Sequence, residues 1–297
     1  MRIVISGSSG LIGTALRTSL STAGHDVVRL VRRAPQSGEI QWDPRAGSLD
    51  PQSLHGADAV INLSGAGIGD KRWSDSYKQE LLDSRLHTTK LLAATIAMAE
   101  NGPAVFLSGS AIGIYGARDD EQLDESSSLG TGFLADLCRQ WEDATSAAEA
   151  AGARVAQLRT GIVLSPKGGA LKKQLPLFKL GLGGKFGSGK AWQSWVSLPD
   201  EVAAISHLLT ADVHGPVNIT APNPVTNAEF TRTLGHVLKR PAFLPIPSFG
   251  PKLLLGGELA DALLFTGQRV LPTMLQRSGF EFTHSKLDEA LRALLGR

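Results

Sequence analysis

Apolar runs alternate with amphipathic segments through the first half of the chain. Residues 2–6, 26–31, 58–63, 104–108 and 154–158 are short apolar runs of the kind that form buried strands. Between them, residues 11–23, 74–99 and 132–151 repeat apolar positions with helical spacing. Buried strands that alternate with such helices form parallel sheets covered on both faces. The pattern therefore predicts an α/β fold with a Rossmann-type, doubly wound parallel sheet.

The pattern changes after about residue 165. Residues 165–190 are rich in Gly and Lys with loose helical spacing, and a strand near 195–197 and a helix over 199–209 follow. Thr226 and Glu229 have the spacing of a capping box. The tail, residues 248–297, reads as helical, with GFEF (279–282) between its last two helices. We expect residues 1–164, with a returning segment 191–221, to form a Rossmann domain. Residues 165–190 and 222–297 should form a smaller, mainly helical C-terminal lobe on the substrate side.

Composition narrows the possible partners. The formal net charge of the 297 residues is +2, and no run of Lys or Arg is long enough to predict a nucleic-acid or membrane partner. No apolar stretch approaches the roughly 20 residues of a membrane span, and the N-terminus has no signal-peptide pattern. Cys138 is the single cysteine, and the seven histidines lack metal-ligand spacing. We expect a cytoplasmic protein without a metal, and an oligomer is compatible with the sequence.

The glycine-rich stretch GSSGLIG directly follows the first predicted strand and opens the first predicted helix. Its spacing is G-x-x-G-x-x-G, which allows a tight turn, a close approach of backbone to a pyrophosphate, and close helix–strand packing. The helix N-terminus adds unpaired N–H groups for the anion. We predict that this loop binds a dinucleotide through Gly7, Ser8, Ser9, Gly10, Leu11, Ile12 and Gly13.

A second glycine-rich stretch, GKFGSGKA (184–191), nearly matches the Walker A pattern of nucleotide triphosphatases. That pattern needs a hydroxyl for Mg²⁺ after its lysine, and it must open a helix. Here Ala191 has no hydroxyl, and the strand-like WQSWVS follows. The stretch is therefore interpreted as a glycine-rich loop near the substrate cleft.

The end of the second predicted strand favours NADP(H) over NAD(H). An NAD-binding domain places an acid there for the ribose hydroxyls. This chain instead continues with Arg32 and Arg33, and Asp26 lies at the opposite end of the strand. A guanidinium binds a 2′-phosphate with charge-assisted hydrogen bonds. The alternative is that both arginines are solvated surface residues.

Several motifs in order resemble the extended short-chain dehydrogenase/reductase superfamily of the NAD-dependent epimerase type. The chain is similar in particular to the "epimerase family protein" branch, which ends in a domain of unknown function. After GSSGLIG the similarity runs through DAVINLSGAGI (58–68), SRLHTTKLL (84–92), SGSAIGIYG (108–116), FLADLCRQWE (133–142), LRTGIVLSPKGG (158–169), FKLGLGGKFGSG (178–189) and GQRVLPTMLQRSGFEF (267–282).

The resemblance implies further site residues. Ser110 matches the catalytic serine of the superfamily, with a purely structural turn as the alternative. Glu80 and Arg85 match positions at the cofactor site, although each could instead pair with other neighbours. The remaining positions that it assigns to the cofactor are Leu63, Ser64, Gly65 and Ser108.

The acid–base pair of the superfamily, Tyr-x-x-x-Lys, is not found in this chain. The residues four positions after Tyr77 and Tyr115 are not lysines, and alignment on Glu142 puts Leu134 and Cys138 at the Tyr and Lys positions. Tyr115, on the same loop as Ser110, is the better candidate for a proton donor, and we expect Cys138 to be core packing.

The segment that follows Tyr115 is strongly acidic. We expect its carboxylates to be solvated, and the polar stretch ESSSLGTG (125–132) to be a mobile loop or a plain connector. The acidic residues are Asp119, Asp120, Glu121, Asp124 and Glu125.

Two functions are compatible with these features. The first is an NADP(H)-dependent oxidoreductase or epimerase-like enzyme that acts on an unidentified small carbonyl or hydroxyl substrate. The second is a non-catalytic NADPH-binding sensor or regulatory protein, which the missing Tyr/Lys pair favours.

Overall fold

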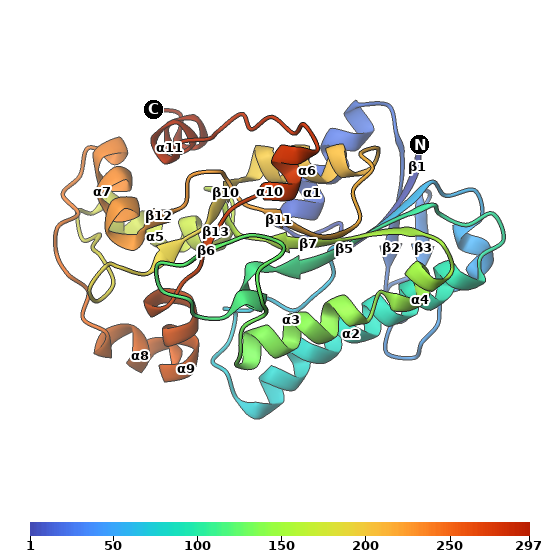
Figure 1. Cartoon of the computed structure of the whole chain (residues 1–297), viewed down its shortest axis with the longest axis horizontal. Helices are drawn as coiled ribbons and strands as arrows, with labels where there is room; N and C mark the ends of the chain where they lie inside the picture. Colours follow the sequence, from blue (N-terminus) through green and yellow to red (C-terminus); the bar gives the residue numbers. More distant parts are fainter.

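The computed structural model describes all 297 residues around one seven-stranded parallel sheet (Figure 1). From one edge to the other its strands are β11 (Gly215–Ile219), β7 (Arg154–Thr160), β5 (Val105–Ala111), β4 (Ala59–Asn62), β1 (Arg2–Ser6), β2 (Asp26–Val31) and β3 (Glu39–Gln41). The chain leaves β1 toward β2 and β3, and then returns to the other side of β1 as β4. The switch point therefore lies between β1 and β4, and the predicted doubly wound fold is confirmed.

Helices cover both faces of the sheet (Figure 1). On one face lie α1 (Leu11–Thr22), α6 (Leu198–Leu208) and α10 (Thr273–Arg277), with Leu16 and Ile205 packed against Ile3 and Ile5. On the other face lie α2 (Asp75–Met98), α3 (Phe133–Asp143) and α4 (Ser146–Ala150). Successive side chains of a strand point to opposite faces, so each apolar strand supplies both cores.

The remaining elements form the helical C-terminal lobe and its connections. Trp195 is completely buried among α5 (Gly169–Lys179), α7 (Asn227–Leu238) and α11 (Leu287–Leu295). The other helices are α8 (Phe249–Leu255), α9 (Gly257–Ala260), η1 (Pro51–Leu54), η2 (Ile112–Tyr115) and η3 (Asp261–Phe265). Three short strand pairs complete the fold: β6 (Gln122–Leu123) with β13 (Arg269–Val270), β8 (Ile162–Leu164) with β10 (Trp195–Ser197), and β9 (Trp192–Gln193) with β12 (Val225–Thr226).

The expected elements differ from the observed ones mainly in the single helix over 132–151. The structure has two helices there, because Thr145 at the break donates its hydroxyl to the carbonyl of Glu142 and accepts a hydrogen bond from Gln157. The capping box of Thr226 and Glu229 is present. Helix α6 packs on the sheet and β11 forms its edge, while the division into domains stays a prediction.

Asp200 joins the C-terminal tail to the Rossmann sheet. Its carboxylate, 1% exposed, accepts hydrogen bonds from the backbone N–H groups of Thr283 and His284 and from the hydroxyl of Ser197. Ser197 in turn caps the start of α6. One buried carboxylate therefore fixes the tail against the helix that covers the sheet.

Glu201, the next residue, is fully buried and has a single partner. Thr160 at the end of β7 donates a hydrogen bond of 2.9 Å to Glu201 Oε1, and Oε2 has no partner. Burial raises the pKa of Glu201 to about 8, against a smaller lowering by the Thr160 hydrogen bond. The carboxyl group is therefore protonated at neutral pH.

This burial should make stability depend on pH. The pKa of Glu201 is about 8 in the native state and about 4.3 in the unfolded chain, so between these values only the native state holds the proton. The free energy of unfolding therefore falls as the pH rises through this window. Glu201→Gln removes the ionisation. The free energy of unfolding of this variant minus that of the parent should therefore increase by about 2–4 kcal/mol from pH 5 to pH 8. Urea unfolding of both proteins measures this, and parallel pH profiles would contradict it.

Candidate active site

The glycine loop lies at the switch point, where the carboxyl ends of β1 and β4 meet. Gly7 has a φ of +68°, and a Cβ there would lie 2.4 Å from the carbonyl oxygen of Leu63. A Cβ on Gly13 would lie 2.3 Å from the carbonyl oxygen of Gly7. Only glycine fits at these two positions, because the loop is pressed against the exit of β4 and the first turn of α1.

The first turn of α1 offers free donors at this place. The N–H groups of Leu11, Ile12 and Gly13 have no hydrogen-bond acceptor in the protein, and Gly10 caps the helix without a side chain. A Cβ on the exposed Gly10 would approach only the carbonyl oxygen of Gly7, at 3.4 Å. The space next to the backbone of Gly10 is therefore free for a ligand. Free amides and the positive helix end suit a pyrophosphate, and these residues therefore fit a dinucleotide.

An acidic residue, Glu39, lies beside the end of β2, where the sequence predicts that no acid is present. Arg33 donates a hydrogen bond of 2.7 Å to each carboxylate oxygen of Glu39, a residue of β3. The side chain of Glu39 is 5% exposed. Arg29 also pairs with Glu39, at 3.1 Å, and donates to the hydroxyl of Ser8 in the glycine loop. Arg32 is exposed and has no carboxylate partner. The charge of Arg33 is thus compensated, and that of Arg32 is free for a ligand.

The exit of β4 is held by side chains rather than left as a free loop. The hydroxyl of Ser64 donates to the hydroxyl of Ser6, and the Ser64 N–H donates to Asn62. Asn62 also donates to Thr89 of α2. This network fixes the backbone of Leu63 and Ser64 beside the glycine loop.

Arg85 supports the same exit from α2. Its guanidinium donates to the carbonyl oxygens of Ala66 and Leu81, and it lies 5.0 Å from the ring of Trp141. Nε has no partner, and burial lowers the pKa of this guanidinium. Glu80, in contrast, is half exposed and pairs with Lys71 at 3.2 Å. The resemblance links both residues to the cofactor, but Arg85 is held in the interior beside the exit of β4 and Glu80 lies on the surface.

The hydroxyl of Ser110 is bound to a buried ion pair at the end of β5. Ser110 Oγ donates to Glu142 Oε1 at 2.6 Å, and Arg159 of β7 holds both oxygens of Glu142, at 2.8 and 2.9 Å. Burial works against the charge of Arg159, but the contacts with Glu142 outweigh it, so the pKa of Arg159 is raised. The lone pairs of Ser110 remain available as acceptors.

Tyr115 does not lie where a donor to a substrate must lie. Its side chain has no exposed surface, its hydroxyl donates to Asn218 Oδ1 at 2.7 Å, and it accepts from Arg159 Nη1 at 2.9 Å. Burial raises the pKa of the phenol, although Arg159 acts in the opposite direction. Tyr115 therefore extends the buried network of Ser110, Glu142 and Arg159 to β11.

The two positions on α3 that align with the superfamily's acid–base pair are packed. Cys138 is 2% exposed, and burial raises its pKa to about 12, so it is a neutral thiol. Leu134 contacts Gly113 of η2. Ser108 is also fully buried, and neither its hydroxyl nor Oε1 of the adjacent Gln157 has a partner. The structure therefore places Ser108 in the interior of the protein and not at an exposed cofactor surface.

The acidic segment is more than the solvated loop that its sequence indicates. Glu125 Oε1 accepts from the backbone N–H groups of Asn218 and Met274, and burial raises the pKa of this carboxyl. Asp120 accepts from the indole of Trp192. These contacts tie the segment to β11 and to the C-terminal lobe.

The second glycine-rich stretch leads into a strand and not into a helix. It leaves the loop after α5 and enters β9, a strand, and Lys190 is exposed. No group of three or more His, Cys, Asp or Glu side chains could hold a metal ion. No helix is both long and apolar enough to cross a bilayer.

Several residues of the buried network were not predicted from the sequence, although one signal of them is present there. Arg159 interrupts an apolar strand with a charge, and a charge at a buried position requires a partner. That partner is Glu142, which served only to align the chain. Asn62 and Asn218 carry a weaker version of the same signal, a polar side chain in an apolar strand.

The sheet order and the glycine loop define a Rossmann-type dinucleotide-binding protein. A model of the NAD dependent epimerase/dehydratase family matches residues 3–220, and a domain of unknown function (DUF1731) matches residues 246–294. The chain belongs to the NAD-dependent epimerase/dehydratase family, as its motifs suggested.

Relatives match over nearly the whole chain. An epimerase family protein of Mycobacterium tuberculosis (strain CDC 1551 / Oshkosh) is 49% identical over 291 residues, which is 97% of this chain and 96% of the relative. The crystal structure of human epimerase family protein SDR39U1 (isoform 2) with NADPH has a TM-score of 0.92 at 34% identity and covers 100% of both chains. A nucleoside-diphosphate sugar epimerase of Corynebacterium glutamicum has a TM-score of 0.81 at 38% identity, covering 100% of this chain and 58% of that one.

The buried network predicts different roles for the two tyrosines of the chain. Tyr115→Phe leaves Arg159 Nη1 and Asn218 Oδ1 without a partner, and we expect it to lower the free energy of unfolding by about 1–3 kcal/mol. Tyr77→Phe is the matched control, since the Tyr77 hydroxyl donates only to the carbonyl oxygen of Gly67. Its loss should be smaller. Chemical denaturation compares them, and equal losses would argue against the network.

Proposed function

We propose that the protein is an NADP(H)-dependent oxidoreductase or epimerase-like enzyme acting on a small carbonyl or hydroxyl substrate, without the usual Tyr-x-x-x-Lys pair. The observation that carries the proposal is the hydrogen bond from Ser110 to Glu142 at the carboxyl end of β5. This end neighbours the exit of β4 and the glycine loop, where the substrate and the cofactor would meet.

The residues present fit NADP(H). The free amides of Leu11, Ile12 and Gly13 would hold the pyrophosphate, and Arg32 would hold the 2′-phosphate. The backbone of 63–65 would line the adenosine side, as the resemblance implies. When bound, the nicotinamide supplies the hydride donor or acceptor. The NADPH in the structure of human SDR39U1 supports this choice.

The proton chemistry would belong to Ser110 and Glu142. The hydrogen of Ser110 is directed to Glu142, so Ser110 Oγ can accept the hydroxyl proton of a substrate while its own proton passes to Glu142 Oε1. In the direction of carbonyl reduction the same two protons move the opposite way. Arg159 holds Glu142 in place from both oxygens, so the carboxylate keeps its position between turnovers.

A non-catalytic NADPH-binding sensor is the second candidate. Leu134 and Cys138 favour it, because the positions that align with the acid–base pair hold an apolar side chain and a buried neutral thiol. A binding protein needs the glycine loop and Arg32, but it does not need the hydroxyl of Ser110.

Cofactor choice tests the assignment of Arg32. We expect NADPH to bind at least about tenfold more tightly than NADH, since one charge-assisted hydrogen bond contributes about 1.5–3 kcal/mol. Arg32→Ala should remove most of this gap, whereas Arg33→Ala should reduce it less, because Arg33 is already paired with Glu39. Titration of each protein with both cofactors measures the gap. Equal dissociation constants in the unmutated protein would exclude the assignment.

Turnover tests the role of Ser110. With a panel of activated carbonyl compounds we expect slow but measurable consumption of NADPH, reduced about 10²-fold or more by Ser110→Ala. Cys138→Ala is the control, because its thiol is buried on the same helix but makes no hydrogen bond to Ser110, Glu142 or Arg159. Glu142→Gln should lower turnover as Ser110→Ala does, while Glu142→Asp should recover part of it.

Two results would redirect the proposal. If Cys138→Ala abolished turnover and Ser110→Ala left it intact, the assigned roles would be reversed. If no compound of a broad panel consumed NADPH although the cofactor bound, the sensor function would replace the enzymatic one.

A further inference from the structure

The small net charge of the chain conceals an uneven distribution. Residues 150–199 and 230–257 contain no Asp or Glu, and most of the residues in these two stretches belong to the C-terminal lobe. Several exposed cations of the lobe have no ion-pair partner, while Lys252 pairs with Asp261. They include Lys172, Lys179, Arg232, Lys239 and Arg240.

The same lobe exposes large apolar side chains. Nine of the twelve large hydrophobic residues that are exposed in this protein lie between residues 177 and 263. Leu180, Phe243, Phe249 and Leu253 are each more than 70% exposed, as is Leu254. Isolated apolar residues are common on protein surfaces, but a cluster of this kind marks an interaction site.

Most of these side chains belong to three segments of the lobe, which we together call the lobe face: residues 177–185, 239–246 and 249–254. Its first two segments lie side by side. The N–H of Ile246 donates to the carbonyl oxygen of Lys185 at 2.8 Å, and Gly181 lies against Pro241. The segment between α7 and α8 runs along the outer edge of the lobe, away from β1 and β2, and leads directly into α8 (Figure 1).

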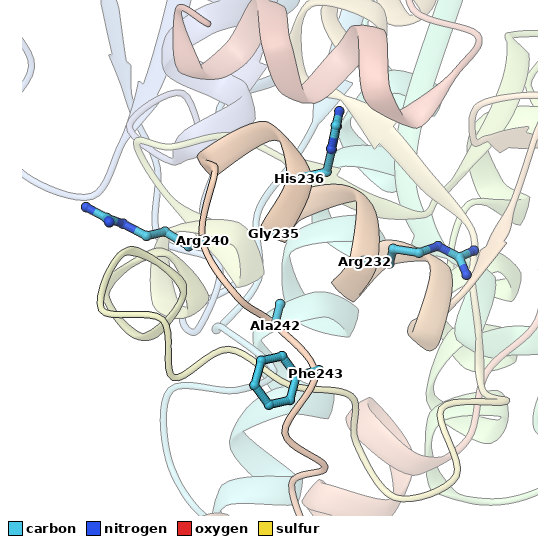
Figure 2. Close-up of a pocket in the computed structure, with 6 residues that line it drawn as sticks. All are labelled: Arg232, Gly235, His236, Arg240, Ala242 and Phe243. Carbon is cyan, nitrogen blue, oxygen red and sulfur yellow. The ribbon is translucent and has the colours of Figure 1, made fainter.

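The cations on and next to the lobe face are spread rather than focused on one point. A notch of about 330 Å³ lies between α7 and residues 240–243. Figure 2 shows that the side chains of Arg232, His236 and Arg240 at this notch point in different directions. They cannot converge on a single phosphate, but they can meet many anionic groups across a surface.

We propose that the lobe face docks on a bilayer surface with anionic headgroups. Leucine and phenylalanine side chains enter the boundary between headgroups and acyl chains, while the surrounding Lys and Arg meet the lipid phosphates. The expectation of no membrane partner depended on the net charge of +2, which averages this face with an acidic Rossmann half.

Two other occupants fit the face less well. A second copy that docked through the same face would bring like charges together, because an isologous interface repeats one patch on both subunits. Nucleic acid would meet the cations, but only Phe243 and Phe249 could stack on its bases, and the exposed leucines around them could not. Lipid is the occupant that uses both the apolar and the cationic parts of the face.

Sedimentation with vesicles tests the proposal on the full chain. We expect at least tenfold more protein to bind vesicles of phosphatidylcholine and phosphatidylglycerol in equal parts than vesicles of phosphatidylcholine alone. Added salt should reduce the binding. The double variant Phe249→Ser with Leu253→Ser, and separately Lys179→Glu with Lys239→Glu, should each lose at least tenfold.

The matched control is Met98→Ser with Lys90→Glu on α2. Both residues are exposed but lie outside the lobe face, so this variant should bind as the parent does. Absent binding, or equal binding to the two kinds of vesicle, would overturn the proposal. It would also be overturned by self-association that Phe249→Ser with Leu253→Ser abolishes, or by binding to duplex DNA as tight as to the mixed vesicles.

Discussion

The buried ion pair of Glu142 and Arg159 is the interaction on which the site depends. It joins α3 to β7, and through Ser110 and Tyr115 it also reaches β5 and β11. Both side chains are largely removed from water, so each charge needs the other, and breaking such a pair costs more than forming it gains. Four elements are therefore fixed relative to one another by one pair of charges at the floor of the site.

This arrangement changes how the family's chemistry would be carried out. The acid–base positions of the superfamily align one and two turns earlier on α3, at Cys138 and Leu134, and here they hold a buried thiol and a half-buried apolar side chain. The polar function of the helix lies instead at Glu142, one turn after Cys138. Our proposal moves the proton chemistry along the helix to this residue, with Ser110 between it and the substrate.

Periodicity and motifs predicted what is local in this protein. The strand–glycine–helix unit at residues 2–23 was identified because its signals are adjacent in sequence. The contacts of Glu39 with Arg33 and of Glu125 with Asn218 depend on how loops fold in three dimensions. No local sequence pattern predicts these contacts. Tyr115 was misjudged for the same reason, since Asn218 is 103 residues away. Net charge likewise said nothing of how charges are segregated between the two halves.

A double-mutant cycle on Glu142→Gln and Arg159→Gln tests the central role of the pair most directly. Free energies of unfolding are measured for the parent, both single variants and the double variant. Each single variant leaves a charge uncompensated and should lose about 3–5 kcal/mol. The double variant should lose less than the sum by at least about 1.5 kcal/mol. Losses that add to within about 0.5 kcal/mol would show that the two residues act independently, contrary to this account.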